Sequence, residues 1–410
     1  MINQDQISND LRNVATIRVA DPIIGGIPPL TITPESENDL IDVVKYTREN
    51  DMTIMARGSG SALQCGGVPN GLDAMVETTK LSDIVEYHPD DLVVVTKAGI
   101  SLSALNETLR RDNLELSLDP PRERYENGST VGGLLATGTA GPRALVRRSV
   151  RDLVLGVRAV LPDGRCVQFG GKVVKNVAGY DLSKLFIGAF GTLGIVTEVA
   201  FRLHPRAHSS AYVASSTDLG SVAELMEKMG RSQLVASGVE MTRHPRKQDV
   251  TLVAGFEGTD RGVERRSATA IDAFDGKLTE RPEWWTDLPE AATVFKVSCS
   301  LGVLGKVLRL ISDMEDELGI GIEVRVSGTG VGYVGVHTAD NDLAATLLTK
   351  IRGLLSVDRQ GVCSILYSSE GLRNIVDPWG EVDGLKYMQE LKDRFDPDRR
   401  LAPGRFVGGI

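Results

Sequence analysis

A loop rich in glycine and serine at residues 56–63 is the first segment whose residue types could do chemistry. It follows an apolar run at 53–56 that predicts a strand, and it reads Ala-Arg-Gly-Ser-Gly-Ser-Ala-Leu. Glycine permits positive φ and close backbone approach, so consecutive N–H groups of such a turn can converge on an anion, and serine hydroxyls add donors. The loop matches neither a Rossmann fingerprint, whose third glycine is missing, nor a P-loop. It favours binding of a pyrophosphate, with an ordinary turn as the alternative.

Two later segments combine glycine with small residues. Residues 128–142 are almost bare of charge and full of Gly, Ala and Thr. Small side chains with hydroxyls suit a flat cofactor lying against the backbone, and a tightly packed core is the alternative. Residues 176–182 and 188–198 then lead through a glycine-rich turn into an apolar strand at 195–201. The backbone of that strand could bond to the edge of a cofactor ring.

A third group of candidates lies on two neighbouring predicted strands in the second half of the chain. Arg325, Tyr333 and His337 could together supply a cation for a carboxylate and a base for a proton. A lone histidine at a strand end is more often structural or solvated, and this alternative stays open. Without a cluster of histidines and carboxylates there is no case for a catalytic metal.

The elements that must position these residues change character near residue 207. The first half reads as mixed α/β, with a strand at 30–34, a helix at 36–50 and the strand at 53–56 that delivers the first loop. From 211 to 366, β-rich runs alternate with amphipathic helices, which is typical of an antiparallel sheet covered by helices. A helix at 384–394 is stopped by proline. We therefore predict domains over residues 1–207 and 208–383, and a C-terminal segment, 384–410, that returns to the first domain.

Composition and charge exclude several classes. The chain has 410 residues, 41% of them hydrophobic, enough for a large core and two or three domains. A net charge of −9 disfavours binding to nucleic acid or to an anionic membrane, because both are negatively charged. The four cysteines have no zinc or iron–sulfur spacing. The start lacks a secretory signal and no apolar run reaches the ~20 residues of a membrane helix, so we expect a cytoplasmic protein whose membrane contacts, if any, come through partners.

Taken in this order and spacing, the segments resemble the FAD-binding domain of the vanillyl-alcohol-oxidase/PCMH flavoprotein family. The resemblance rests on residues 56–61, 129–142, 151–156, 176–182 and 191–198. More narrowly, residues 171–182 are similar to the E-type subunits of bacterial glycolate oxidases. Residues 391–397 are similar to the closing segment of the D-lactate dehydrogenase and glycolate oxidase branch.

The resemblance implies an α+β fold: a PCMH-type, non-Rossmann FAD-binding domain of two α/β subdomains, and an α+β cap domain with an antiparallel sheet. It implies that residues 57–63 wrap the pyrophosphate, that 130–133 and 137–141 line the ribityl and isoalloxazine region, and that the backbone near Ile195 bonds to the ring. The implied cofactor contacts are Arg57, Gly58, Ser59, Gly60, Ser61, Ala62, Leu63, Thr130, Val131, Gly132, Gly133, Thr137, Gly138, Thr139, Ala140, Gly141, Gly194 and Ile195.

Two departures from the family pattern matter. Ser61 stands where some relatives carry a histidine that bonds covalently to flavin, so we expect noncovalent FAD. The cap also lacks the His-rich H-x-G-D-G-N-x-H type of segment found in relatives that oxidise 2-hydroxy acids. A separate run of arginines leaves three interpretations open: a solvated basic face, ion pairs with residues such as Asp152, or contact with flavin or a partner. These arginines are Arg143, Arg147, Arg148 and Arg151.

The missing His-rich segment favours one functional hypothesis over two others. The resemblance implies the FAD-binding subunit of a glycolate oxidase complex, supporting oxidation of glycolate to glyoxylate, with a catalytic flavoprotein subunit and an iron–sulfur subunit as partners. One alternative is a stand-alone FAD-dependent dehydrogenase of a small hydroxy acid or alcohol. The other alternative is a scaffold that has lost its cofactor. The loops retain small residues at the positions where bulky ones would block FAD, which disfavours this alternative.

Overall fold

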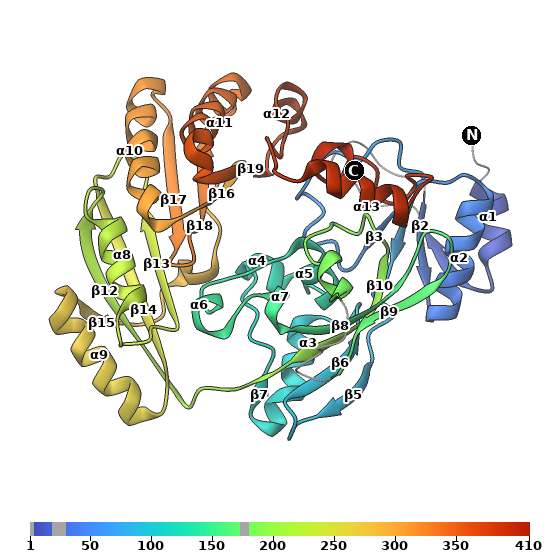
Figure 1. Ribbon diagram of the computed structural model, residues 1–410, viewed down its shortest axis with the longest axis horizontal. Coiled ribbons are helices and arrows are strands. Elements are labelled where there is room, and N and C mark those ends of the chain that lie inside the picture. Colours follow the sequence, from blue (N-terminus) through green and yellow to red (C-terminus); the bar gives the residue numbers. More distant parts are fainter. Residues whose placement is uncertain (1–3, 19–29, 173–179) are drawn as a thin grey trace. The chain divides into compact units, whose positions relative to one another are not determined.

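The computed structural model describes residues 4–18, 30–172 and 180–410, which form two compact units (Figure 1). Unit 1 is built from the described residues up to Thr139, from Ser149–Arg206 and from Asp383–Ile410, and unit 2 from Ala140–Arg148 and Ala207–Val382. The boundary expected at residue 207 places residues 140–148 in the first domain. The structure instead joins them to unit 2, because helix α6 (Ala144–Arg147) contacts strand β13 (Gly238–Arg243) there.

The first sheet of unit 1 delivers the glycine-rich loop. Its strands run in the order β1 (Ala15–Arg18), β2 (Leu30–Pro34), β4 (Ala74–Glu77), β3 (Ile54–Arg57), with β4 parallel to both of its neighbours. Helix α1 (Gln4–Leu11) precedes the sheet, and helix α2 (Glu37–Glu49) packs on it through Leu40, Val43 and Val44. Ser36 caps α2 by accepting a hydrogen bond from the backbone N–H of Asp39. The strand–helix–strand reading of the sequence is confirmed here.

The second sheet of unit 1 is antiparallel and carries the other small-residue segments. Its strands run in the order β5 (Ile84–His88), β6 (Val93–Lys97), β10 (Ile195–Arg202), β8 (Val154–Val160), β9 (Cys166–Gly170). Helices α3 (Leu102–Leu109), α5 (Val131–Thr137) and α7 (Val150–Leu153) share its core. Helix α4 (Arg122–Glu126) and a short pair, β7 (Leu114–Glu115) with β11 (His204–Pro205), complete this part.

Unit 2 is an eight-stranded antiparallel sheet with helices packed on one face. The order is β15 (Lys277–Thr279), β12 (Ser209–Asp218), β14 (Asp249–Gly258), β13, β17 (Gly321–Ser327), β18 (Val331–His337), β16 (Thr293–Cys299), β19 (Gly361–Tyr367). The helices are α8 (Val222–Arg231), α9 (Asp260–Phe274), α10 (Leu301–Leu318), α11 (Asn341–Ser356) and α12 (Glu370–Ile375). Alternate strand residues such as Val324 and Val334 enter the helix-covered core, so their neighbours in sequence point to the open face. This agrees with the α+β fold that the sequence predicts.

The C-terminal segment closes unit 1. Helix α13 (Leu385–Phe395) ends at Asp396, and Leu401 then forms a parallel bridge with Ile54 of β3. The backbone N–H of Ile54 donates to the Arg400 carbonyl at 2.9 Å, and that of Ala402 donates to the Ile54 carbonyl at 2.7 Å. The segment thus extends the first sheet beside the strand that leads into the glycine-rich loop. None of the helices that the structure describes combines the length and apolar character needed to span a bilayer.

Glu37, at the start of α2, ties the first sheet's helix to the second sheet. Its carboxylate accepts from Arg158 of β8 at 2.7–2.9 Å and from the Thr197 hydroxyl of β10 at 2.6 Å. Burial raises the pKa of this carboxyl. The hydrogen bonds from Arg158 and Thr197, together with the positive charge of Arg158, outweigh that effect and lower the pKa of Glu37 to about 2.

We predict that Glu37→Gln destabilises the protein at neutral pH by about 1.5–3 kcal/mol, the usual value of hydrogen bonds to a charged group. The depressed pKa means that the unfolded chain binds more protons between the unfolded value of 4.5 and about 2. The stabilisation by Glu37 is therefore complete above that window and is lost as the pH falls through it. Urea unfolding followed by far-UV circular dichroism should show the wild type and the variant converging between pH 5 and pH 2.5.

The matched control is Glu49→Gln, an exposed carboxylate at the other end of α2. It should shift the unfolding midpoint little at any pH. A difference between Glu37→Gln and wild type that stays constant down to pH 2.5 would contradict the assignment of this link.

Candidate functional site

The glycine-rich loop after β3 is held from one side by its own arginine. Arg57 donates to the carbonyls of Gly58 at 3.3 Å and Ser59 at 3.2 Å, and its Nε lies 3.3 Å from Glu77. Gly60 has φ +87°, a conformation that favours glycine, and a Cβ there would meet the Arg57 guanidinium at 2.7 Å. Arg57 therefore shapes the loop by binding its carbonyl oxygens.

Ser59 provides a buried polar atom in this loop that has no partner within the described residues. Its hydroxyl is shielded from solvent, yet no described donor or acceptor reaches it. The residue lines a hollow, so rotation of the side chain toward that hollow would let the hydroxyl bind a ligand oxygen. Ser61 beside it contacts the Ser129 hydroxyl at 3.0 Å. The loop thus offers hydroxyl and backbone donors, as a phosphate group requires.

Two adjoining hollows in unit 1 share Ala56, Arg57, Gly58, Gly133, Ala136 and Phe190, and we call them together the trough. The hollow at the loop has a volume of about 510 Å³ and the other about 530 Å³, both open to solvent. Half of the residues that line the second hollow belong to 186–196, among them Phe186, Leu193 and Ile195. We call the end with the hydroxyl side chains of the loop the polar end, and the end with the aliphatic and aromatic side chains before β10 the apolar end.

Missing side chains keep the trough open. Gly191 has φ +73°, and the nearest atom to a Cβ placed there would be the Cβ of Ala56, at 4.0 Å. Both residues line the trough, so a larger side chain at position 191 would project over its lining. Gly132 serves packing instead, because a Cβ there would lie 2.9 Å from the backbone oxygen of Ala98. Gly58 allows the loop to approach α5, since its Cβ would lie 2.1 Å from the Thr130 hydroxyl.

The C-terminal segment supports the apolar end of the trough. Phe395 meets Phe186 edge to face, with ring centroids 6.0 Å apart, and Phe406 stacks on Phe190 at the same separation. The ammonium of Lys392, from the same segment, donates to the Thr192 carbonyl at 2.8 Å. Residues 186–196, which we call the wall, are thus contacted by three side chains of the C-terminal segment.

The structure brings most of the residues suggested by the resemblance to the trough. Those that line it are Arg57, Gly58, Ser59, Gly60, Ser61, Ala62, Leu63, Thr130, Gly132, Gly133, Thr137, Gly194 and Ile195. Five others do not line it: Val131, Gly138, Thr139, Ala140 and Gly141. Val131 is fully buried in the core of the second sheet because the helical period turns it away from Gly133. Ala140 and Gly141 belong to unit 2.

Sequence reasoning missed several residues of the trough. Ala136, Phe190 and Arg405 line it without having been singled out. Arg405 is 4% exposed and donates to the Gly67 carbonyl at 2.9 Å. The resemblance of the C-terminal segment was the available signal for Arg405. The contact of Arg405 with Gly67 joins residues 338 positions apart, so no local pattern in the sequence indicates it. The part of the glycolate-oxidase-like motif at residues 173–179 lies outside the described residues.

Arg325, Tyr333 and His337 lie together on the open face of the unit 2 sheet. Arg325 and Tyr333 are cross-strand partners on β17 and β18. Arg325 forms an ion pair with Glu323 at 2.7 Å, and His337 Nε2 lies 4.0 Å from the other oxygen of the same carboxylate. Glu323, which the sequence analysis did not consider, therefore links two of the three candidates. The buried Nη1 of Arg325 has no hydrogen-bond partner within the described residues.

Two of the four arginines in the run pair with a carboxylate of unit 2. Arg143 and Arg147 lie 3.9 and 3.5 Å from Glu257 of β14, within unit 2. The Asp152 carboxylate instead accepts from the backbone and hydroxyl of Ser149 and caps α7. Among the described residues no group of histidine, cysteine and carboxylate side chains could hold a metal ion.

The trough fits the parts of FAD by its chemistry. The loop, with its unsatisfied Ser59 hydroxyl and its backbone donors, suits the pyrophosphate. The glycines and apolar side chains of the second hollow suit a flat ring system. Bound FAD supplies the chemistry of hydride acceptance and electron transfer.

Comparison with known proteins agrees with this fit. A sequence family described as FAD binding domain matches residues 28–170. A D-lactate dehydrogenase from Archaeoglobus fulgidus is 33% identical, over 92% of this chain and 91% of that protein. The glycolate oxidase subunit GlcE of Escherichia coli is 34% identical, but over 48% of this chain and 54% of that subunit. A crystal structure of p-cresol methylhydroxylase has the same fold, with a TM-score of 0.72, 14% identity and coverage of 98% and 97% of the two chains.

The chain has the PCMH-type FAD-binding fold, and the trough offers what FAD needs. The similarity to the archaeal relative extends along nearly the whole of both chains. The chain therefore belongs to the FAD-linked oxidoreductase family and is an FAD-dependent oxidoreductase.

Proposed function

We propose that this chain is the FAD-binding subunit of a complex that oxidises a small 2-hydroxy acid, with glycolate as the first candidate. The substrate loses two electrons and two protons and becomes a 2-oxo acid, here glyoxylate. A related catalytic flavoprotein subunit and an iron–sulfur subunit are the proposed partners, and electrons leave through them. We place this work in the cytoplasm, with any membrane contact made by the partners.

One observation carries the choice of a subunit over a self-sufficient enzyme. All five histidines of the sequence lie in described residues, and none of them lines the trough. Oxidation of a hydroxy acid needs a base for the hydroxyl proton close to the reactive edge of the flavin. The chain also lacks the His-rich segment of catalytic relatives. A base supplied by a partner subunit accounts for both facts.

On this proposal the chain's own residues bind and orient the cofactor. The backbone and hydroxyls of residues 58–61 bind the pyrophosphate, and Ser59 gains the hydrogen bond that it lacks. Gly191, Gly194 and Ile195 give the ring a flat apolar seat. Ser61, in the position where some relatives carry a histidine, leaves the FAD noncovalently bound. Thr137 binds Thr139 at 2.7 Å and the Gly133 carbonyl at 2.8 Å, which fixes the end of α5 beside the trough.

A stand-alone dehydrogenase of D-lactate or a similar acid is the second candidate. The nearly complete match to the archaeal D-lactate dehydrogenase supports it. So does the cluster of Arg325, Glu323 and His337, in which the free Nη1 of Arg325 could bind a carboxylate and the His337 imidazole could accept a proton.

We predict that Ala136→Trp abolishes retention of FAD while the protein stays folded. Ala136 lines both hollows, so an indole there fills the space between the loop and the wall. The ratio of flavin absorbance to protein absorbance, and titration of the apoprotein with FAD, measure the effect. Ala104→Trp places the same side chain on the exposed face of α3 and should retain FAD as the wild type does. Normal FAD content in Ala136→Trp would refute the trough as the binding site.

The subunit proposal is tested by anaerobic visible spectra of the purified chain with glycolate or D-lactate. We expect the oxidised-flavin band to persist with either acid, to bleach with dithionite, and to bleach with the acid once the partner subunits are present. Bleaching of the isolated chain by a hydroxy acid would instead establish the stand-alone dehydrogenase. Absence of any flavin after reconstitution with FAD would favour the scaffold.

His337→Ala separates the same two candidates at the level of a side chain. We expect the assembled complex to keep its rate of hydroxy-acid oxidation within about threefold, because the base comes from a partner. The stand-alone mechanism requires a loss of 10²–10⁴-fold, the usual contribution of a general base. Steady-state assays of the complex, with His88→Ala at an exposed site as the control, distinguish the two results.

A further inference from the structure

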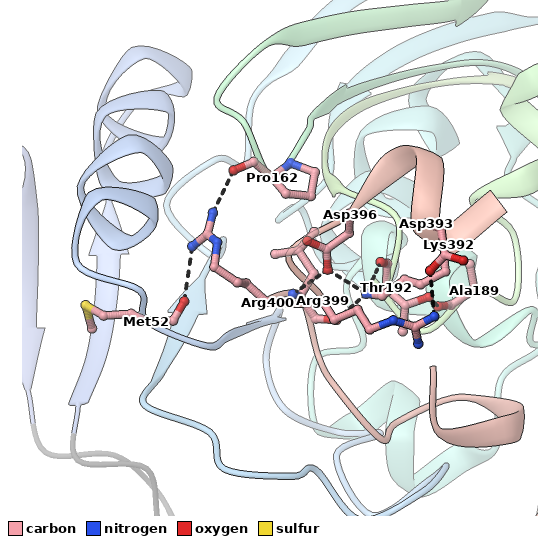
Figure 2. A network of polar contacts seen from close by, with 10 residues as sticks. Met52, Pro162, Ala189, Thr192, Lys392, Asp393, Asp396, Arg399 and Arg400 are labelled. Atoms are coloured by element: carbon pink, nitrogen blue, oxygen red, sulfur yellow. Dashed lines mark hydrogen bonds and ion pairs between the residues drawn. The ribbon is translucent and has the colours of Figure 1, made fainter. Parts of the chain in front are cut away.

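Lys392 is a buried cation that contacts the wall of the trough at Thr192 (Figure 2). Its side chain is 1% exposed, and its ammonium donates to the Thr192 carbonyl at 2.8 Å, the Leu401 carbonyl at 2.9 Å and Asp396 at 2.6 Å. A lysine ammonium has three donors, and these three acceptors use all of them. Asp396 is fully buried and also accepts from the backbone N–H of Leu401 at 2.8 Å. The position of the ammonium is therefore fixed from three sides.

The contact with Thr192 determines how the wall presents its backbone. A trans peptide directs its C=O and its N–H to opposite sides. Since the Thr192 oxygen points to Lys392, the N–H of Leu193, which belongs to the same peptide, points away from Lys392. Ala189, Phe190, Gly191, Leu193, Gly194 and Ile195 line the trough, whereas Thr192 does not. Of residues 189–195, only Thr192 is thus turned away from the trough, which agrees with a peptide whose carbonyl side faces the lysine and whose N–H side faces the trough.

A full positive charge on the carbonyl side also alters the donor strength of this peptide. A hydrogen bond accepted by a carbonyl polarises the peptide and strengthens its N–H as a donor, and the effect is larger where water is excluded. Both the lysine and the peptide oxygen are buried. The Leu193 N–H is thus both oriented and strengthened by Lys392.

We propose that Lys392 is a positioning residue for the flavin: it holds the Thr192–Leu193 peptide so that the Leu193 N–H donates to the polar edge of the isoalloxazine ring, where negative charge gathers on reduction. Asp396 and Leu401 fix the lysine for this purpose. The inference rests on FAD binding in the trough and is independent of which substrate is oxidised. Its readouts are properties of the flavin, so a failure of the proposed hydroxy-acid function leaves the test intact.

The test is the double variant Lys392→Met/Asp396→Asn, which removes both charges and leaves neither buried ion without its partner. We expect the dissociation constant for FAD to rise at least tenfold. The midpoint potential of the bound flavin, measured by dye equilibration, should become more negative, because the reduced, anionic ring loses a strengthened donor. An unchanged dissociation constant and potential in a folded double variant would overturn the proposal.

Arg400→Met is the matched control. Arg400 is another buried cation of the same segment, but it donates to the carbonyls of Met52 at 3.1 Å and Pro162 at 2.8 Å, neither of which lines the trough (Figure 2). This variant should lower the unfolding midpoint while the flavin potential stays at the wild-type value. An equal shift of the potential in Arg400→Met would show that Lys392 acts only through general stability, and would also overturn the proposal.

A measurement on the wild-type protein decides the matter if the double variant does not fold. Hydrogen exchange resolved to single amides compares the apoprotein with the FAD complex. We expect exchange at Leu193 to slow at least tenfold more than at Ile54, whose N–H already donates to the Arg400 carbonyl. Equal slowing at the two amides would contradict a hydrogen bond from Leu193 to the flavin.

Discussion

The buried ion pair between Lys392 and Asp396 is the interaction on which the site depends most. It joins the end of α13 to Thr192 in the wall and to Leu401, which bridges to β3. Burial lowers the pKa of Lys392, while the charge of Asp396 opposes that change. Removing one partner would leave an isolated charge in the interior, which is strongly destabilising. The last residues of the chain are therefore required to assemble a site whose other parts come from its first half.

The trough shows how two sheets with different connections build one binding surface. The loop 58–61 comes from the end of a strand in a mainly parallel sheet, and the wall leads into the central strand of an antiparallel sheet. Glu37 links the two parts through Arg158, and the C-terminal segment contacts both sides. The polar end and the apolar end of the trough thus have separate structural supports. This division matches a cofactor that is charged at its pyrophosphate and flat and apolar at its ring.

How far the sequence could predict this arrangement depends on the range of the interactions. The loop at 57–63 was predictable because its glycines and serines act locally, and the helix at 36–50 because its apolar residues share one face. Of residues 137–141, which the resemblance implies as cofactor contacts, only Thr137 lines the trough, because α5 ends at Gly138 and the chain enters unit 2 at Ala140. Arg405 and Glu323 were missed, since their roles arise from contacts across the chain or across neighbouring strands.

The central claim is that FAD lies in the trough, with its pyrophosphate on the loop and its ring on the wall. A crystal structure of the protein reconstituted with FAD tests this most directly. The account predicts phosphate oxygens within hydrogen-bond distance of the Ser59 hydroxyl and of loop N–H groups, and the ring edge against residues 191–195. Flavin bound elsewhere in unit 1, or a Ser59 hydroxyl that stays without a partner in the complex, would contradict it.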